Sequence, residues 1–330
     1  MIVADGFVSD PTSAAAHGST VPGASHQSVV ARFAIEPLGA GGWRAALLQA
    51  FGLPHLARHT PAQLVAGSLA ADALWLATPV HLLAGLDRVH LPFDGILSLP
   101  PSACAALCDA FNPVFREDGV ELSCAGEDCF VLAGLACEAG GGFEPQRWLG
   151  RDLRDAQPAG ASRRFRALGA QIETWLHQQP LNRQRAAAGL PAVSQLWLWG
   201  AAPVGGAASE QGVPRARWLC GSDAYARAAA RDAGVDLLTP ATGCSELLQQ
   251  RQDCGVIVTT LGSDAQRFES DWLRPALAAV REGRVDQLCI LANDRQISLR
   301  RTDAWRPWRR RLSWRDALCQ PAARAQALRA

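Results

Sequence analysis

The sequence of 330 residues contains no lysine, so all 32 of its basic side chains are arginines. A Walker-type phosphate loop, Schiff-base chemistry and the attachment of pyridoxal phosphate each need a lysine amine. The sequence therefore excludes these three chemistries. With 31 acidic side chains the net charge is only +1, which provides no overall field to attract nucleic acid or an anionic membrane.

Signals for export and membrane insertion are also missing. The first 20 residues lack the basic start and continuous apolar run of a secretory signal. The most apolar long window, 69–86, is interrupted by Asp72, Pro79 and His81, so no transmembrane helix is expected. The ten cysteines include no Cys-x-x-Cys pair, and we expect a cytoplasmic protein with reduced thiols.

Cys104 and Cys108 fall on one apolar stripe of an expected helix. Such a stripe is a core pattern, and metal binding is the weaker alternative.

No histidine occurs after His177. Two-metal phosphoryl-transfer sites commonly combine aspartates with histidines at the ends of parallel strands. The expected strands 256–260 and 288–292 are each followed by one carboxylate, Asp264 or Asp294, and by no histidine. Because Arg295 adjoins Asp294, an ion pair is expected there. We therefore predict no metal ligands, no cofactor and no catalytic residues.

The segment 180–200, PLNRQRAAAGLPAVSQLWLWG, predicts a helix and then a strand. Asn182 is the expected N-cap and Gly189 the stop signal of the helix. In the strand two tryptophans alternate with two leucines, so both faces are apolar. This pattern favours a central strand of a covered, largely parallel sheet. The strand ends at Gly200, where α/β proteins often place ligands.

Strands and helices alternate over the C-terminal half, which predicts βαβ units. The expected strands are 217–220, 235–238, 256–260, 288–292 and 297–300, with a helix over 265–282. The predicted class is α/β, a mostly parallel sheet with flanking helices and a small α+β subdomain.

We expect four regions along the chain. Residues 1–28 are rich in Ala, Ser, Gly and Pro, a composition typical of disordered segments. The regions are a disordered or poorly packed tail (1–28), an N-terminal part of the core (29–88), the α+β subdomain (89–160) and the α/β core with its C-terminal tail (161–330). Within the subdomain we expect a helix over 102–115 and a hairpin of strands 120–124 and 129–135. Apolar residues at helical spacing predict a further helix over 162–178.

The C-terminal tail interleaves Trp305, Trp308 and Trp314 with six arginines between residues 301 and 315. Arginine and tryptophan together suit stacking on nucleobases and contact with phosphates. Alternatively, the tryptophans pack on the core while the arginines stay solvated. No known nucleic-acid motif accompanies them, so we favour packing and expect no nucleic-acid partner.

Two segments carry a resemblance to a known family. The first, 180–202, resembles the signature of RpfE-type bacterial regulatory proteins, which are also labelled phosphoglycerate mutase-like. The second, 75–91, resembles another block of that family, with Thr78 in place of an expected acid. Its matching residues are Pro79, Val80, His81, Leu82, Asp87 and Arg88.

More distantly, the chain is similar to the archaeal-type cofactor-independent phosphoglycerate mutases of the alkaline phosphatase superfamily. That similarity implies a two-metal site and a serine or threonine phosphorylated in turn. The Asp-His metal pairs of those enzymes have no counterpart in the C-terminal half. We interpret Asp5-Gly6, which lies in the expected tail, as a coincidental match to their early metal and nucleophile block.

The resemblance thus implies a reduced alkaline phosphatase-like core that acts as a regulatory or ligand-binding protein. The alternative is a phosphoglycerate mutase or phosphatase-type phosphoryl-transfer enzyme. The expected ligand is a small phosphorylated or carboxylated molecule. Its predicted contacts are Asn182, Arg183, Arg185, Gly200, Asp264, Asp294 and Arg295, with arginines as anion contacts.

Overall fold

The computed structural model describes most of the chain, and contacts divide the chain into two compact units. Unit 1 comprises Met1–Pro54, Gly206–Ser222 and Ala230–Ala330, and unit 2 comprises His55–Gly205 and Asp223–Ala229. The described residues are 1–5, 30–38, 41–69, 71–85, 88–137, 142–150, 152–153, 162–205, 215–239, 241, 243–251, 253–260, 265–292, 295–305, 311–314 and 317. The region 161–330, which we expected to form one core, is therefore divided at residue 205. Its first strand, 195–199, pairs with residues 76–80 and belongs to unit 2.

Unit 1 is built on a seven-stranded sheet of order β11-β10-β12-β1-β13-β14-β3. The first five strands in this order run parallel, and β14 and β3 are antiparallel to their neighbours. The mostly parallel sheet agrees with the predicted class. The strands are β1 (Ile2–Asp5), β3 (Ala34–Pro37), β10 (Trp218–Cys220), β11 (Asp236–Leu238), β12 (Gly255–Thr260), β13 (Gln287–Ala292) and β14 (Arg295–Arg300).

Strand β1 lies in the centre of this sheet. Ile2 pairs with Ile257 of β12 on one side and with Ile290 of β13 on the other, and Ile2 and Val3 are buried. The prediction of a disordered or poorly packed tail is wrong for residues 2–5. Three apolar residues suffice for a strand when neighbours cover both sides, whereas composition reflects the whole segment. Residues 6–29 lie outside the described residues.

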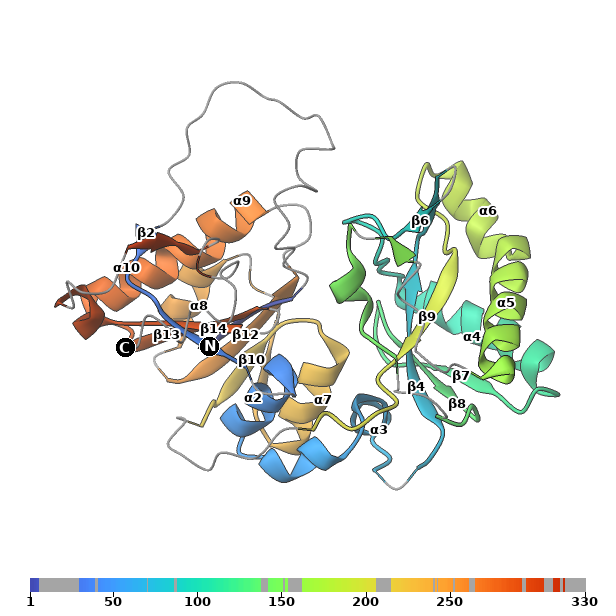
Figure 1. Ribbon diagram of the computed structural model, residues 1–330, viewed down its shortest axis with the longest axis horizontal. Coiled ribbons are helices and arrows are strands. Elements are labelled where there is room, and N and C mark those ends of the chain that lie inside the picture. The colour runs from blue at the N-terminus through green and yellow to red at the C-terminus, as the bar shows by residue number, and fades with distance from the viewer. Residues whose placement is uncertain are drawn as a thin grey trace. The chain divides into compact units, whose positions relative to one another are not determined.

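Helices cover both faces of the sheet of unit 1. Figure 1 shows α8 (Cys244–Gln250) and α10 (Arg274–Glu282) on one side and α2 (Gly42–Ala50) on the other. The helix expected over 265–282 is continuous but changes type, from α9 (Ala265–Phe268) through the π-helical η4 (Glu269–Leu273) to α10. The wider π turn precedes Pro275, whose ring cannot fit the regular spacing of an α-helix.

Trp314 packs into the core of unit 1. Its side chain is fully buried, its ring centroid lies 5.3 Å from that of Phe268, and its Nε1 donates a hydrogen bond to Glu269 Oε2 at 2.9 Å. Glu269 is also buried and accepts a hydrogen bond from Arg274 at 2.6 Å. The packing expected of the tail tryptophans is confirmed for Trp314; the side chains of Trp305 and Trp308 lie outside the described residues. The short strands β2 (Val30–Ala31) and β15 (Leu312–Ser313) pair beside it, and η5 (Arg301–Trp305) follows β14.

Unit 2 is built on an antiparallel four-stranded sheet of order β7-β8-β4-β9. The strands are β4 (Leu74–Val80), β7 (Glu121–Cys124), β8 (Phe130–Ala133) and β9 (Gln195–Trp199). The expected hairpin of the subdomain is observed as β7 and β8. The helices are α3 (Pro61–Ala66), α4 (Pro101–Phe115), α5 (Arg163–Gln178) and α6 (Pro180–Ala187), with 3-10 turns η1 (Pro54–Arg58) and η2 (Pro145–Trp148) and the short strands β5 (Leu83–Ala84) and β6 (Val89–His90). Helix α7 (Ala224–Asp232) contributes residues to both units.

The prediction that the tryptophan strand is central in a parallel sheet is wrong. Strand β9 is the last strand of the four-stranded sheet, and among the described strands it pairs only with β4, in antiparallel orientation. Leu196 packs on the core beneath α5, whereas Trp197 donates through Nε1 to the carbonyl of Phe143 at 2.7 Å. Both faces of β9 are apolar because other parts of the chain cover both. Apolar residues on both faces of a strand therefore do not require a neighbouring strand on each side.

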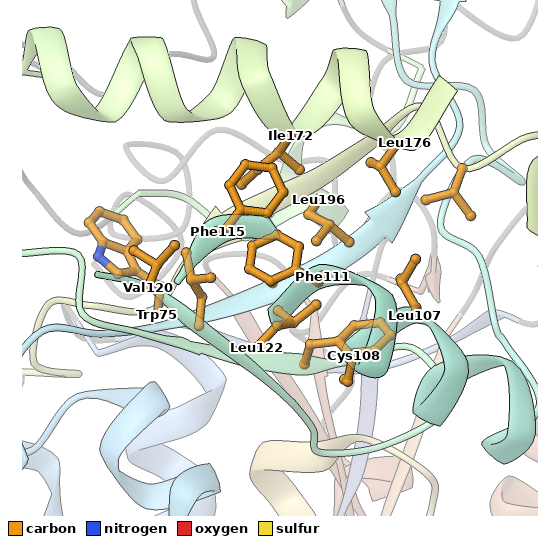
Figure 2. Packing of buried hydrophobic residues seen from close by; sticks show 14 of the residues in the cluster. Trp75, Leu107, Cys108, Phe111, Phe115, Val120, Leu122, Ile172, Leu176 and Leu196 are labelled. Atoms are coloured by element: carbon orange, nitrogen blue, oxygen red, sulfur yellow. The ribbon is translucent and has the colours of Figure 1, made fainter. Parts of the chain in front are cut away.

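The core of unit 2 lies between the sheet and helices α4 and α5 (Figure 2). Phe111 and Phe115 of α4 stack with a centroid distance of 4.3 Å, and Trp175 of α5 meets both rings edge-on. The helical stripes predicted over 102–115 and 162–178 therefore both face this core.

Asn112 of α4 closes the outer side of β7. Its Nδ2 donates to the Leu122 carbonyl at 3.0 Å, and its Oδ1 accepts the Leu122 amide hydrogen at 2.8 Å. The carboxamide thus takes the place of a neighbouring strand, which removes a free edge that would otherwise invite pairing with another chain.

The central position of β1 predicts a large loss of stability when Ile2 is truncated. We expect Ile2→Ala to lower the free energy of unfolding by about 2–5 kcal/mol, because it leaves a cavity in the core between the sheet and its covering helices. Urea unfolding followed by tryptophan fluorescence measures the change. Val114→Ala, at a side chain 53% exposed on α4, is the control and should stay within about 0.5 kcal/mol of the parent. Equal effects of the two substitutions would contradict the placement of β1.

Candidate functional site

After two neighbouring strands of the seven-stranded sheet, β10 and β12, the chain continues toward opposite sides of the sheet. From β10 the chain continues to β11, at the outside of the sheet, whereas from β12 it continues across β1 to β13. In open α/β sheets such a reversal marks the usual ligand site, outside the carboxyl ends of the strands. The candidate site is therefore formed by the carboxyl ends of β10, β12, β1 and β13, which we call the carboxyl edge.

Asp5 is the last residue of β1 and reaches the carboxyl edge. In the parallel register Asp5 pairs with Thr260, the last residue of β12, so these two strands end level with each other. On the other side Val3 pairs with Leu291, and β13 ends at Ala292. Asp5 therefore belongs to a strand of the sheet and not to the expected tail. The signal that could have found it is the apolar triplet directly before an aspartate.

Gly221, directly after β10, brings the backbone of the carboxyl edge against β12. Its φ is +153°, and a Cβ atom at this position would lie 2.6 Å from the carbonyl oxygen of Val258. Because that distance is shorter than any van der Waals contact, the position requires glycine. The turn after β10, with the exposed Ser222, thus stays close to β12.

Cys220 ends β10 with a buried thiol. Its Sγ accepts the Ala241 amide hydrogen at 3.5 Å, so it joins the turn after β11 to β10. Burial raises the pKa of this thiol, and the hydrogen bond from Ala241 opposes the shift. A thiol with a raised pKa stays protonated at neutral pH and is a poor nucleophile, so Cys220 is structural.

Arg295 is the predicted anion contact that the structure describes in unit 1. It is 8% exposed and begins β14, opposite Ala292 of β13 and Pro37 of β3. Asp264 and Asp294 lie outside the described residues. In the sequence Asp264 follows the end of β12 by four residues and Asp294 follows the end of β13 by two.

The other predicted contacts, Asn182, Arg183, Arg185 and Gly200, belong to unit 2. The seven predicted contacts are thus divided between the two units.

Asn182 is not the N-cap of α6, which is Gln179 with Pro180 following. The Asn182 side chain is buried, and its Nδ2 donates to the carbonyls of Leu176 at 2.8 Å and Val193 at 2.9 Å. Its Oδ1 accepts the Val193 amide hydrogen at 2.8 Å. Both donors are used inside the protein, so the side chain holds the entrance of β9 against the end of α5. Pro180, which suits the first helical turn, moved the cap upstream of the expected position.

The remaining predicted contacts of unit 2 differ in exposure. Arg183 is exposed. Arg185 is half-buried, donates through Nε to the Pro191 carbonyl at 2.7 Å, and has a pKa lowered by burial. Gly200 has a φ of +73° and accepts the Ala62 amide hydrogen at 3.1 Å. Gly200 therefore ends β9 and joins it to α3.

The two segments that carry the family resemblance lie side by side as β4 and β9. Thr78, which stands in place of an expected acid, is buried and accepts a hydrogen bond from Trp199 Nε1 at 2.9 Å. His81 follows β4, and its Nδ1 lies 2.9 Å from the Ala192 carbonyl and 3.5 Å from Ser194 Oγ. Because a carbonyl only accepts, Nδ1 carries the proton. His81 therefore cannot take a proton from Ser194 through this nitrogen, and the pair is not a nucleophile and base.

A pocket of about 260 Å³ adjoins Ala201, the residue after Gly200. Its lining includes the carboxylate of Asp72 and no basic side chain among the described residues. This charge disfavours an anionic ligand. Its lining residues are Thr60, Gln63, Ala71, Asp72, Ala73, Leu74, Ala136, Cys137 and Ala201.

A metal-binding cluster and a membrane-spanning helix are both absent from the described residues. No three or more His, Cys, Asp or Glu side chains in that part of the chain are arranged to hold a metal ion. Within the same residues, no helix combines the length and apolar character that crossing a membrane requires.

No family model and no curated protein matches the sequence. Among solved structures, the chain is similar to the PH0037 protein from Pyrococcus horikoshii, with a TM-score of 0.38 and 13% identity over 87% of this chain and 82% of that one. It is also similar to a cofactor-independent phosphoglycerate mutase from Thermoplasma acidophilum DSM 1728, with a TM-score of 0.33 and 13% identity over 81% and 78% of the two chains. Similarity at this level assigns no function.

The hydrogen bonds of Asn182 predict a specific loss of stability. Asn182→Ala leaves the Val193 amide and two carbonyls without their partner, and we expect the free energy of unfolding to fall by about 1–3 kcal/mol. The control is Gln184→Ala, an exposed position of the same helix, which should change it by less than about 0.5 kcal/mol. Thermal unfolding monitored by circular dichroism compares the two variants. If both melt like the parent, Asn182 does not hold β9 as described.

Proposed function

We propose that the protein binds a small phosphorylated or carboxylated molecule at the carboxyl edge of the seven-stranded sheet. In this proposal it is a regulatory or ligand-binding protein on a phosphoglycerate mutase-like fold. The observation that carries the proposal is the central position of β1, which brings Asp5 level with the end of β12.

Three carboxylates and one arginine belong to or adjoin the strand ends of this edge, a charge that disfavours a bare anion, so the proposed ligand carries hydroxyl groups or binds together with a bridging cation. Arg295 provides a guanidinium at the start of β14, and guanidinium groups bind phosphate and carboxylate through two parallel hydrogen bonds. Asp5, Asp264 and Asp294 belong to or follow the three adjoining strands β1, β12 and β13. Carboxylates accept hydrogen bonds from hydroxyl groups, and they bind divalent cations that in turn hold phosphates.

The predicted contacts of unit 2 enter the proposal in two groups. Arg183, exposed on α6, is the proposed anion contact there, and ordinary surface charge is the alternative. Asn182, Arg185 and Gly200 make hydrogen bonds within the protein, and we assign them to holding the ends of β9 rather than to a ligand.

A second candidate is metal-dependent phosphoryl transfer. It is favoured by the same three carboxylates, because divalent ions in such enzymes stabilise the attacking and leaving oxygens. It is opposed by the lack of histidine after residue 177 of the sequence.

The proposal predicts ligand binding that depends on the acids of the carboxyl edge. We expect a panel of sugar phosphates, nucleotides and carboxylic acids, with and without Mn²⁺, to contain compounds that raise the melting temperature. For such a compound, Asp5→Asn, Asp264→Asn and Asp294→Asn should each weaken binding by about tenfold or more, measured by isothermal titration calorimetry.

The chain offers matched controls at the opposite side of the same sheet. Asp253 and Asp286 are exposed and precede β12 and β13 at their amino ends. Asp253→Asn and Asp286→Asn should leave the dissociation constant unchanged. If all five substitutions act alike, or no compound of the panel binds, the proposed site is wrong. Release of phosphate from the bound compounds with Mn²⁺ present would favour the phosphoryl-transfer enzyme instead.

A further inference from the structure

Three cysteines come together between helix α4 and strand β7 in unit 2. Cys104 and Cys108 are one helical turn apart on α4 and are both buried, whereas Cys124 ends β7 and is exposed. Cys124 lies close enough to both helix cysteines for its thiol to raise their pKa values.

Two contacts fix how α4 runs along β7. Near its carboxyl end, Asn112 is hydrogen-bonded to the backbone of Leu122. Eight residues earlier, the Sγ of Cys104 lies 3.6 Å from the Gly126 carbonyl oxygen. The helix and the strand are therefore antiparallel. Cys108 lies midway along α4 between Cys104 and Asn112, and Cys124 lies midway along the chain between Leu122 and Gly126, so Cys108 and Cys124 lie at about the same level.

The two thiols also face each other. Side chains two residues apart in a strand share a face, so Cys124 points to the same side as Leu122. Leu122 packs in the core, and Figure 2 shows it beside Cys108, below Phe111. The contact between Cys104 and Gly126 shows that a sulfur on this face of α4 reaches the backbone of the β7–β8 hairpin.

We propose that Cys108 and Cys124 form a reversible disulfide that joins α4 to the edge strand β7. This inference is independent of the ligand site in unit 1. Its accessible member is Cys124, which meets the oxidant first, and its buried member is Cys108, which resolves the intermediate.

The chemistry balances with a low-molecular-weight disulfide as the oxidant. The Cys124 thiolate attacks one sulfur of the disulfide, forming a mixed disulfide and releasing one small thiolate. The Cys108 thiolate then attacks the Cys124 sulfur, forming the protein disulfide and releasing the second small thiolate. Two protein thiols are oxidised, one small disulfide is reduced to two thiols, and the two protons go to the released thiolates.

The environment of Cys108 controls the second step. Burial raises the pKa of the Cys108 thiol to about 12, and the neighbouring charges of Cys124, Cys104 and Asp109 also raise it. The resolving step needs the Cys108 thiolate, so it should accelerate as the pH rises.

The test is oxidation of the full chain with oxidised glutathione, followed by alkylation, trypsin digestion and mass spectrometry. Cleavage after Arg88, Arg116 and Arg147 gives peptides 89–116 and 117–147, which separate the helix cysteines from Cys124. We expect these two peptides to be joined in the oxidised parent and separate again after reduction. The joined species should form faster at pH 9 than at pH 7.

Matched variants identify the two sulfurs. Cys124→Ser and Cys108→Ala should abolish the joined species, and Cys124→Ser should also prevent the mixed disulfide at that position. Cys104→Ala, at a buried position on the same face of α4, and Cys137→Ser, at an exposed position of the same tryptic peptide, should form it as the parent does. Because Cys124 is exposed, its variant tests the proposal even if Cys108→Ala is poorly folded. The proposal is overturned if Cys124 ends as a stable glutathione adduct, or if the joined species survives either of the first two substitutions.

Discussion

The pairing of β1 between β12 and β13 is the interaction on which the arrangement of unit 1 depends. Ile2 and Val3 are buried, and β1 is paired on both sides, so the four residues of β1 complete a sheet whose other parallel strands come from residues 218–292. The same pairing brings Asp5 to the edge where the chain direction reverses. Stability and the proposed ligand site therefore share one cause, and a change that removes β1 should affect both.

In unit 2 two asparagine side chains hold the two outer strands of the sheet in place. Asn182 and Asn112 each bind both backbone groups of one residue, Val193 before β9 and Leu122 in β7. One fixes how the sheet begins its last strand, and the other closes the opposite edge. Because an unsatisfied buried amide or carbonyl costs about 1–3 kcal/mol, these side chains help to define the register of the sheet as well as its stability.

The long elements could be predicted from the sequence because their apolar residues recur at helical spacing. Helices α4 and α5 and the hairpin of β7 and β8 agree with the prediction to within a few residues. Strand β1 could not be predicted, because its burial comes from partners about 250 residues away in the sequence. The prediction that β9 is central in a parallel sheet was wrong. Apolar residues on both faces of a strand indicate that both faces are buried, but they do not indicate which elements cover them.

The candidate site was predictable only in part. Asp264 and Asp294 each follow a predicted strand, and their role stays a prediction, whereas Arg295 precedes the strand predicted over 297–300 and begins β14. Asp5 was missed because its strand was missed. Asn182 was predicted to cap helix α6, but the cap is Gln179, because Pro180 begins the helix. Residues whose role depends on distant pairing need the fold before they can be interpreted.

Hydrogen exchange of the backbone amides of residues 2–5 tests the central position of β1 most directly. Amides in the middle of a seven-stranded sheet exchange only when the sheet opens, so we predict that they are protected to the same extent as those of β12, measured by mass spectrometry on N-terminal peptides. Exchange at the rate of an unstructured peptide, while β12 and β13 remain protected, would contradict the account.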